Sequence, residues 1–287
     1  MLFVAPEGTE LLEPLPAGSI FQVALVRDRG EIAVCKRLLP RVRREPAARA
    51  AIVREATALD RARHRSLPPL RRVGSDEHGP FVIEGHVAGA SVRALAEGWR
   101  ARGAAVPGRL VAHLAHAAAE ALAAVHELAG EGGHAGGDPH LAGPLLLSHG
   151  DLGPDHVILA PLGEARFVDF GAARFAGMDA ALETADRGTL PFAAPEVARG
   201  EVAPRQAADV YALAATLVFL AGAGEPLLAA RDDAAMLLEI GERGLPPELC
   251  DRATALSSTA RDALRHALAF HPGARLARAR DLCAALS

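Results

Sequence analysis

The sequence predicts an α+β protein in which a small β-rich lobe with one helix precedes a larger helical lobe. Short β-branched segments recur within the first 84 residues, whereas Ala- and Leu-rich stretches with helical spacing dominate after residue 110. The 287 residues are 50% hydrophobic with a formal net charge of −4, which excludes a disordered chain. We expect lobes of residues 1–84 and 85–287, with the binding site in the cleft between them.

The predicted elements of the first lobe follow from local patterns. Two strands are expected in residues 19–38, where apolar and β-branched segments flank a turn at Gly30. Residues 47–63 are Ala-rich with helical apolar spacing, and the two prolines at 68–69 prevent the helix from continuing. A second strand pair is expected in residues 70–84.

The second lobe is predicted to be mainly helical. A long Ala-rich helix is expected over residues 110–128, followed by a Gly-rich insertion at about 129–144 that we expect to be a mobile surface segment. Short strands are expected around 156–169, and mostly helix from about 207. The uncharged apolar run 210–224 is too short to span a membrane, which favours a buried core helix.

The composition excludes several classes of protein. A mildly acidic chain lacks the basic face of a dedicated nucleic-acid binder, so we expect no nucleic-acid partner. Cys35, Cys250 and Cys283 are too few and too scattered for a disulfide framework or a zinc site. Pro6 and Glu7 interrupt the apolar start, which argues against a signal peptide. We expect a cytoplasmic protein with no membrane partner; the sequence leaves its oligomeric state open.

Lys36 is the only lysine among 31 basic residues, and the other 30 are arginine. A compact ammonium is not interchangeable with a guanidinium where a point charge is needed. At the end of an apolar strand, such a group can point into a cleft and hold phosphate oxygens. It then needs a carboxylate partner, and Glu55, nineteen residues later in the predicted helix, is suitable.

Two aspartates lie in segments suited to phosphate chemistry. Asp151 belongs to a polar turn before an apolar strand, where a carboxylate can accept a proton from an attacking hydroxyl. Asp169 ends a strand and precedes Phe170 and Gly171, and its carboxylate can hold Mg²⁺. Gly18 opens the first strand pair, where a glycine allows backbone N–H groups to approach a phosphate.

The order of these motifs resembles the eukaryotic-type Ser/Thr protein kinases of bacteria over almost the whole chain. The resemblance depends on many motifs in sequence rather than on any one of them. The matching segments are Ala33-Val34-Cys35-Lys36, Glu55, the strand 81–87, His149-Gly150-Asp151, Asp169-Phe170-Gly171, Gly188-Thr189, Ala194-Pro195-Glu196, 209–213 and 271–275.

The resemblance implies a bilobal protein kinase-like fold that transfers the γ-phosphate of ATP to a hydroxyl of a protein substrate or signalling partner. Lys36 would hold the α- and β-phosphates and pair with Glu55, while Asp151 would orient and deprotonate the acceptor hydroxyl. Asp169 would hold Mg²⁺. The remaining ATP-binding positions implied are Gly18, Val23 and Val34, Ile158, and the backbone groups of Glu84 and His86.

Several positions depart from the family pattern. Pro16 and Phe21 replace the outer glycines of the phosphate loop, and Val34 narrows the adenine slot. Gly150 stands where the family has an arginine that receives a phosphate on the activation segment, the segment whose end resembles residues 188–196 here. His156 replaces the asparagine that holds a second Mg²⁺, and imidazole suits Mn²⁺ better than Mg²⁺. A lysine that contacts the γ-phosphate is also replaced, here by glycine at position 153.

Three functions are consistent with these residues. The intact set of Lys36, Glu55, Asp151 and Asp169 favours an active protein Ser/Thr kinase. The departures favour a nucleotide-binding pseudokinase that acts as a scaffold. The His-Gly-Asp triplet is also similar to that of the aminoglycoside kinases, which phosphorylate small molecules, although the segments at 188–196 are typical of a peptide platform.

Overall fold

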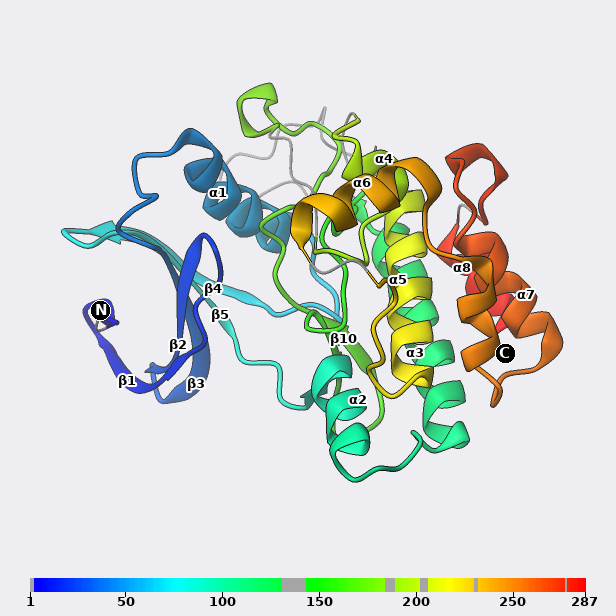
Figure 1. The fold of residues 1–287 in the computed structure, drawn as a ribbon. Coiled ribbons are helices and arrows are strands. Elements are labelled where there is room, and N and C mark those ends of the chain that lie inside the picture. Colours follow the sequence, from blue (N-terminus) through cyan, green and yellow to red (C-terminus); the bar gives the residue numbers. More distant parts are fainter. Residues whose placement is uncertain (1–2, 131–142, 184–188, 202–205, 230–231, 277) are drawn as a thin grey trace.

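The computed structural model describes residues 3–130, 143–183, 189–201, 206–229, 232–276 and 278–287. Its chain forms a small lobe built on one β-sheet and a larger lobe built of helices (Figure 1). The α+β architecture in two lobes is therefore as the sequence predicts.

The small lobe contains a five-stranded antiparallel sheet with the order β1-β2-β3-β5-β4. A tight turn at Arg29 and Gly30, both with positive φ, joins β2 to β3. Strand β1 was not predicted from the sequence; it is an edge strand whose residues are partly or fully exposed. The strands are β1 (Thr9–Leu15), β2 (Phe21–Asp28), β3 (Glu31–Leu38), β4 (Leu70–Asp76) and β5 (Gly79–Gly85).

The two faces of this sheet have different partners. Side chains alternate along β3, so Cys35 faces the outer side, where Phe3 of the N-terminal segment covers it. Burial raises the pKa of the Cys35 thiol to about 12, which makes it unreactive. The inner side packs against helix α1 (Pro46–Arg61) through Phe21, Leu38, Val42, Ala48, Ala51, Ile52 and Val82. Lys36 lies on this inner side.

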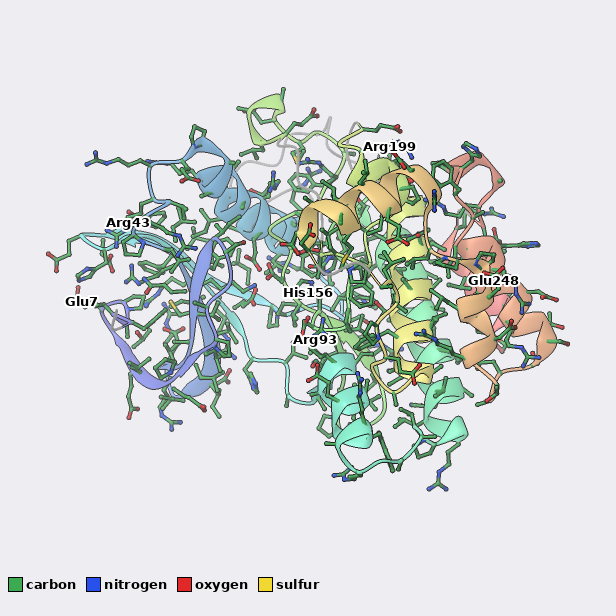
Figure 2. The ribbon with its side chains drawn as sticks, viewed as in Figure 1. Glu7, Arg43, Arg93, His156, Arg199 and Glu248 are labelled. Atoms are coloured by element: carbon green, nitrogen blue, oxygen red, sulfur yellow. The ribbon has the colours of Figure 1, made fainter. Side chains whose placement is uncertain are left out.

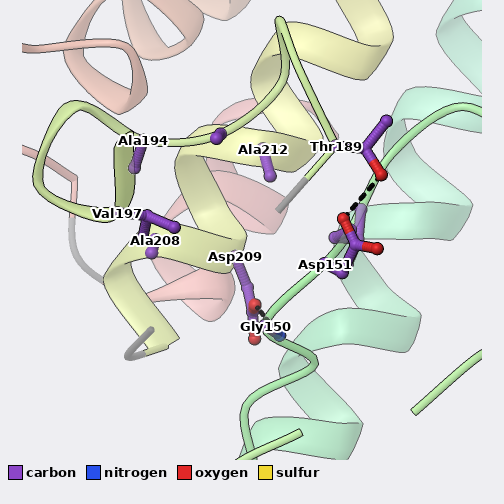
Figure 3. Close-up of a pocket in the computed structure, with 10 residues that line it drawn as sticks. Gly150, Asp151, Thr189, Ala194, Val197, Ala208, Asp209 and Ala212 are labelled. Carbon is purple, nitrogen blue, oxygen red and sulfur yellow. Dashed lines mark hydrogen bonds between the residues drawn. The ribbon is translucent and has the colours of Figure 1, made fainter. Parts of the chain in front are cut away.

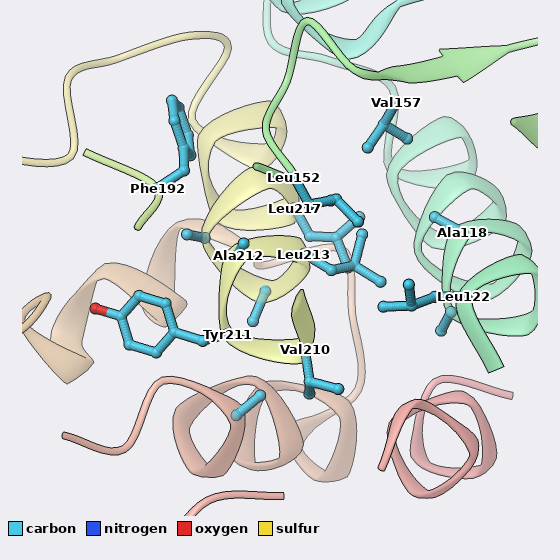
Figure 4. Packing of buried hydrophobic residues seen from close by; sticks show 14 of the residues in the cluster. Ala118, Leu122, Leu152, Val157, Phe192, Val210, Tyr211, Ala212, Leu213 and Leu217 are labelled. Carbon is cyan, nitrogen blue, oxygen red and sulfur yellow. The ribbon is translucent and has the colours of Figure 1, made fainter. Parts of the chain in front are cut away.

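The large lobe is organised around α5 (Gln206–Ala221), which corresponds to the apolar run that the sequence analysis expected in the core. Residues 208–220 of this helix are all buried (Figure 4). In the described parts of the chain, no helix combines the length and apolarity needed to cross a bilayer. The other helices are α2 (Val92–Ala101), α3 (Gly108–His126), α4 (Pro195–Ala198), α6 (Asp233–Arg243), α7 (Ser258–Ala267) and α8 (Ala279–Ala285), with 3-10 turns at Ala180–Leu182, Pro247–Arg252 and Pro272–Ala274.

Short strands line the lobe junction. Antiparallel β9 (Val157–Leu159) and β10 (Ala165–Phe167) form a small sheet with β6 (Ala90–Ser91), and they place the predicted Asp-bearing loops on either side of one hairpin. Two further strands, β7 (Ala129–Gly130) and β8 (Gly143–Pro144), pair at the ends of the predicted Gly-rich insertion. Residues 131–142 of that insertion lie outside the described residues.

Arg275 fastens the end of the chain to the centre of the large lobe. Its buried guanidinium donates two hydrogen bonds to the Glu196 carboxylate, at 2.7 and 2.9 Å, and another to the carbonyl oxygen of Ala269. It also lies over the ring of Tyr211, 4.9 Å from the ring centroid. The pair thus joins α4, α5 and the loop before α8.

Replacing Arg275 with alanine should lower the free energy of unfolding by about 3 kcal/mol, because the largely buried carboxylate of Glu196, 15% exposed, loses its charged partner. Urea denaturation would measure this. Arg278→Ala is the matched control: this arginine pairs with Asp281 but its side chain is 77% exposed. A solvent-exposed pair contributes little, so equal losses in the two variants would contradict this interpretation.

Candidate active site

Lys36 lies at the centre of a buried cluster of charges. Its Nζ donates a hydrogen bond to Oε1 of Glu55 and lies 3.2 Å from Oε1 of Glu84 and 3.7 Å from Oδ1 of Asp169. Lys36 is 5% exposed and Glu55 is fully buried. The structure thus brings together three of the predicted site residues from β3, α1 and the segment after β10, and it adds the side chain of Glu84.

The position of Glu84 follows from the strand register. Glu84 pairs with Val34 and Val82 pairs with Lys36, so all four side chains share the inner face of the sheet. For Glu84 the family resemblance implied only a backbone role, toward adenine. Its side chain instead points to Lys36. This orientation could have been predicted from the alternation of side chains along β5, because Phe81 and Ile83 face outward and Glu84 therefore faces inward.

The electrostatics of the cluster reflect three carboxylates around one ammonium. Burial alone would lower the pKa of Lys36, but the surrounding carboxylates outweigh burial and raise it well above its usual value. Burial raises the pKa of Glu84 and that of Glu55, the latter to about 8. For Asp169 the charges of Lys36 and His156 overcome burial and lower the pKa. Lys36 therefore stays protonated and Asp169 stays ionised at neutral pH.

Asp169 faces the cleft from a bend with φ of 70° just beyond β10. Its side chain is 37% exposed and borders a cavity of about 760 Å³ that Gly18 and Asp151 also line. The next residue, Phe170, is buried and donates its backbone N–H to Oε1 of Glu55 at 3.3 Å. The partner of Lys36 thereby also holds the metal-binding segment that the sequence predicts.

Asp209 of α5 fixes the loop that carries Asp151. Its carboxylate accepts hydrogen bonds from the backbone N–H groups of His149 and Gly150, at 2.8 and 3.0 Å. Figure 3 shows the bond from Gly150. The ring of His126 lies 2.9 Å from the same carboxylate. From the sequence, Asp209 was expected at the start of a buried helix, with no role of its own. A buried carboxylate with several donors is a rigid support for the loop.

Asp151 projects from this loop toward the activation segment. Its Oδ1 accepts a hydrogen bond from the hydroxyl of Thr189 at 2.6 Å (Figure 3). Burial raises the pKa of Asp151, although the charge of His156 and the Thr189 hydroxyl oppose the rise. A partly buried carboxylate in contact with a hydroxyl is chemically suited to accept a proton.

His156 lies between the two aspartates, at the junction of the lobes (Figure 2). Its Nδ1 donates to the backbone oxygen of Asp151 at 2.6 Å, and its Nε2 lies 3.8 Å from Oδ2 of Asp169. Burial opposes protonation, but both carboxylates outweigh it and raise the pKa of His156. The Asp169 carboxylate, open to the cleft, therefore fits a hard divalent cation, whereas His156 is a poor second ligand for Mg²⁺.

The phosphate-loop region differs from the expected glycine-rich turn. Gly18 donates its backbone N–H to the carbonyl oxygen of Phe21 at 3.0 Å, which closes a short turn over the cavity. Phe21 belongs to the cluster beneath α1, and a Cβ on Gly171 would lie 3.4 Å from its ring. The phenyl group thus packs against the segment after Asp169.

Of the remaining predicted ATP-binding residues, Val23 lines the same cavity, whereas Val34, Ile158 and His86 are not among its lining residues. Val23 pairs with Lys36 in the β2–β3 ladder, and with Val34 it is partly exposed on the inner face of the sheet. Ile158, in β9, is partly exposed on the large lobe. His86 is exposed just beyond the end of β5.

Two arginines of α1 fasten the start of the activation segment. Arg54 is fully buried and donates to the carbonyl oxygens of Gly171 and Leu182, at 2.7 and 2.8 Å. Arg61 donates to the carbonyl oxygen of Ala176 at 2.7 Å. These bonds order the described part of the segment through its backbone, and they lie on a helix that also carries the partner of Lys36.

The comparison with protein families identifies the class of this structure. The model of the protein kinase domain family matches residues 10–285, which include both lobes and the whole cluster around Lys36. The chain therefore belongs to the protein kinase family.

Two curated proteins illustrate the similarity. The chain is 29% identical to Serine/threonine-protein kinase PknD of Mycobacterium tuberculosis over 212 residues, which is 72% of this chain and 28% of the relative. It is 31% identical to Mitogen-activated protein kinase kinase kinase 18 of Arabidopsis thaliana over 105 residues, 36% of this chain and 30% of the relative. The chain covers less than a third of the length of these relatives.

The buried His149 should make stability fall in acid. Its Nε2 donates to the carbonyl oxygen of Val168 at 3.0 Å, and its ring lies 4.6 Å from that of Phe170. Burial lowers the pKa of His149 from 6.5 to about 4. The imidazole therefore binds a proton more tightly in the unfolded chain than in the folded one. The contribution of the neutral ring to stability is complete above pH 6.5 and is lost as the pH falls toward 4.

We expect this histidine to cost about 2 kcal/mol of unfolding free energy between pH 7 and pH 5. His149→Phe keeps an aromatic ring but removes the titration, so its stability should decline less over the same range. Urea unfolding curves for both proteins at the two pH values would measure the difference. Equal declines would show that His149 does not titrate differently in the folded and unfolded states.

Proposed function

We propose that the chain is an active protein Ser/Thr kinase that transfers the γ-phosphate of ATP to a protein hydroxyl. The observation that best supports this is that Asp169 and Asp151 line one cavity, with Nζ of Lys36 3.7 Å from Asp169 and Glu55 paired with the lysine. Asp151 already accepts a hydrogen bond from an aliphatic hydroxyl, that of Thr189. A substrate hydroxyl in that place would be oriented for attack.

Each residue would contribute through position and charge, which dominate catalysis of phosphoryl transfer. Lys36 would bind the α- and β-phosphates, with Glu55 fixing its position. Asp151 would accept the proton of the attacking hydroxyl. Asp169 would hold a divalent cation, Mg²⁺ or Mn²⁺, and this cation would supply neutralisation of phosphate charge. The adenine would lie in the slot formed by Val23, Val34 and Ile158, near the backbone of residues 84–86.

A protein substrate is favoured over a small molecule by the surroundings of the activation segment. Arg275 holds Glu196 and with it the short helix α4, which follows Thr189 and forms a firm surface beside Asp151. The printed names of the relatives also support Ser/Thr specificity, and the alignment to the bacterial protein over 72% of the chain supports membership of the bacterial branch. Three free cysteines support a reducing, cytoplasmic setting for signalling.

A nucleotide-binding pseudokinase is the second candidate, and a specific observation favours it. Glu84 contacts Lys36 at 3.2 Å, and His156 stands in place of a hard metal ligand. Both features weaken groups on which phosphate transfer depends, while leaving a cleft that can accept a nucleotide. The two candidates differ in one measurable property, the transfer of phosphate.

Asp151→Ala should reduce phosphate transfer by about 10²–10⁴-fold, because the acceptor hydroxyl loses its general base. Nucleotide affinity should stay within about twofold, since Asp151 contacts the hydroxyl rather than the nucleotide. Transfer of labelled phosphate to the protein itself and to a generic basic protein would be measured with Mg²⁺ and with Mn²⁺. Asp262→Ala, on an exposed face of α7, is the control and should retain full activity.

Nucleotide binding by the wild type without transfer in either metal would reject the kinase and establish the pseudokinase. Transfer that persists in Asp151→Ala would reject the role of that carboxylate.

His156→Asn should shift the metal preference of the reaction from Mn²⁺ toward Mg²⁺. The amide oxygen of asparagine is a hard ligand, whereas imidazole nitrogen is not. The ratio of the rates in Mn²⁺ and Mg²⁺ should therefore fall by about tenfold, which corresponds to a change of 1.4 kcal/mol in relative transition-state stabilisation. A ratio that does not change would show that residue 156 takes no part in metal binding.

A further inference from the structure

Glu84 is a buried carboxylate that the proposed reaction does not use. Its side chain is 3% exposed, and its Oε1 lies 3.2 Å from Nζ of Lys36. Its other oxygen, Oε2, is buried and has no hydrogen-bond partner among the described residues. A buried, half-satisfied carboxylate is costly, so Lys36 is the interaction that keeps Glu84 in this position.

Carboxyl groups crowd the ammonium of Lys36. Its Nζ donates a hydrogen bond to Glu55, and it lies 3.2 Å from Glu84 and 3.7 Å from Asp169. A phosphate group that contacts Lys36 must therefore compete with them. Glu55 accepts a second hydrogen bond, from the backbone N–H of Phe170. Asp169 is exposed to the cleft, where a cation can bind its carboxylate in place of Lys36. Among the described residues, Glu84 has neither a backbone donor nor an opening to the cleft; besides Lys36, it contacts the carboxyl group of Glu55.

We propose that Glu84 competes with the phosphates of the nucleotide for Lys36 and thereby weakens nucleotide binding. The proposal rests on the nucleotide-binding role proposed above for the cleft. Glu84 pairs with Val34 in the sheet, so it lies beside the slot assigned to adenine and two residues along β3 from Lys36.

The test compares nucleotides with and without phosphates. Calorimetric titration would measure the binding of ATP, ADP and adenosine to the wild type, Glu84→Gln and Glu84→Leu. Both variants should bind ATP at least about tenfold more tightly, whereas adenosine affinity should change by less than about threefold. Glu77→Gln is the matched control, because that side chain is 87% exposed and lies on the turn between β4 and β5.

A double-variant cycle locates the effect on the lysine. With Lys36 replaced by methionine there is no ammonium to compete for, so adding Glu84→Gln should change ATP affinity by less than about threefold. A gain as large as in the wild-type background would show that Glu84 acts without Lys36, and it would overturn the proposal.

The other outcomes are equally decisive. Equal gains for ATP and adenosine would mean that Glu84 acts on the base, and unchanged ATP binding in both variants would mean that it does not compete; either result overturns the proposal but leaves the proposed kinase intact. If no protein binds ATP or adenosine, the nucleotide-binding function fails, and this proposal fails with it.

A measurement on the wild type covers the case in which the Glu84 variants do not fold. Because Glu84 occupies Lys36, the phosphates should add less than about tenfold to the affinity of adenosine in the absence of metal. A wild type that binds ATP a thousandfold or more above adenosine under these conditions would have a free Lys36 and would overturn the proposal.

Discussion

The buried ammonium of Lys36 is the interaction on which the geometry of the cleft depends. It joins a strand of the sheet, helix α1, the inner strand β5 and the segment that carries Asp169. Each of these groups would be costly to bury alone, so the cluster is stable only when all of them are in place. If helix α1 moved away from the sheet, Lys36 would lose its contact with Glu55 and both groups would be left without this partner. The position of α1 is therefore coupled to that of Asp169.

The two lobes support this centre in different ways. Below it, Asp209 fixes the loop of Asp151 from the core of the large lobe through backbone N–H groups. Above it, Arg54 and Arg61 reach from α1 to the carbonyl oxygens of the activation segment. Gly150 offers no side chain to receive a phosphate, whereas these backbone contacts hold described residues of the segment, Gly171, Ala176 and Leu182, without one. An assembled cleft is therefore compatible with an unmodified chain.

Much of the arrangement could be predicted because it depends on local spacing. The strand that carries Lys36, the helix that carries Glu55 and the order of the two aspartates all follow from short motifs. Strand β1 and helix α2 gave weaker signals, since one is an exposed edge strand and the other has ten residues with few buried. The acceptors of Arg54 are backbone carbonyl oxygens, which have no signature in the sequence. The role of Glu84 was overlooked although the alternation of β5 contained it.

The arginine-rich composition has a practical consequence for experiments on this cleft. Lys36 is the single lysine of the 287 residues, so isotopic labelling of lysine marks one ammonium group, and that group lies among the charges described above. Its resonance would report on the occupancy of the cleft without assignment of any other signal. Because every other basic residue is arginine, the rest of the protein surface contributes no lysine signal. The chain therefore carries a spectroscopic reporter inside the cleft itself.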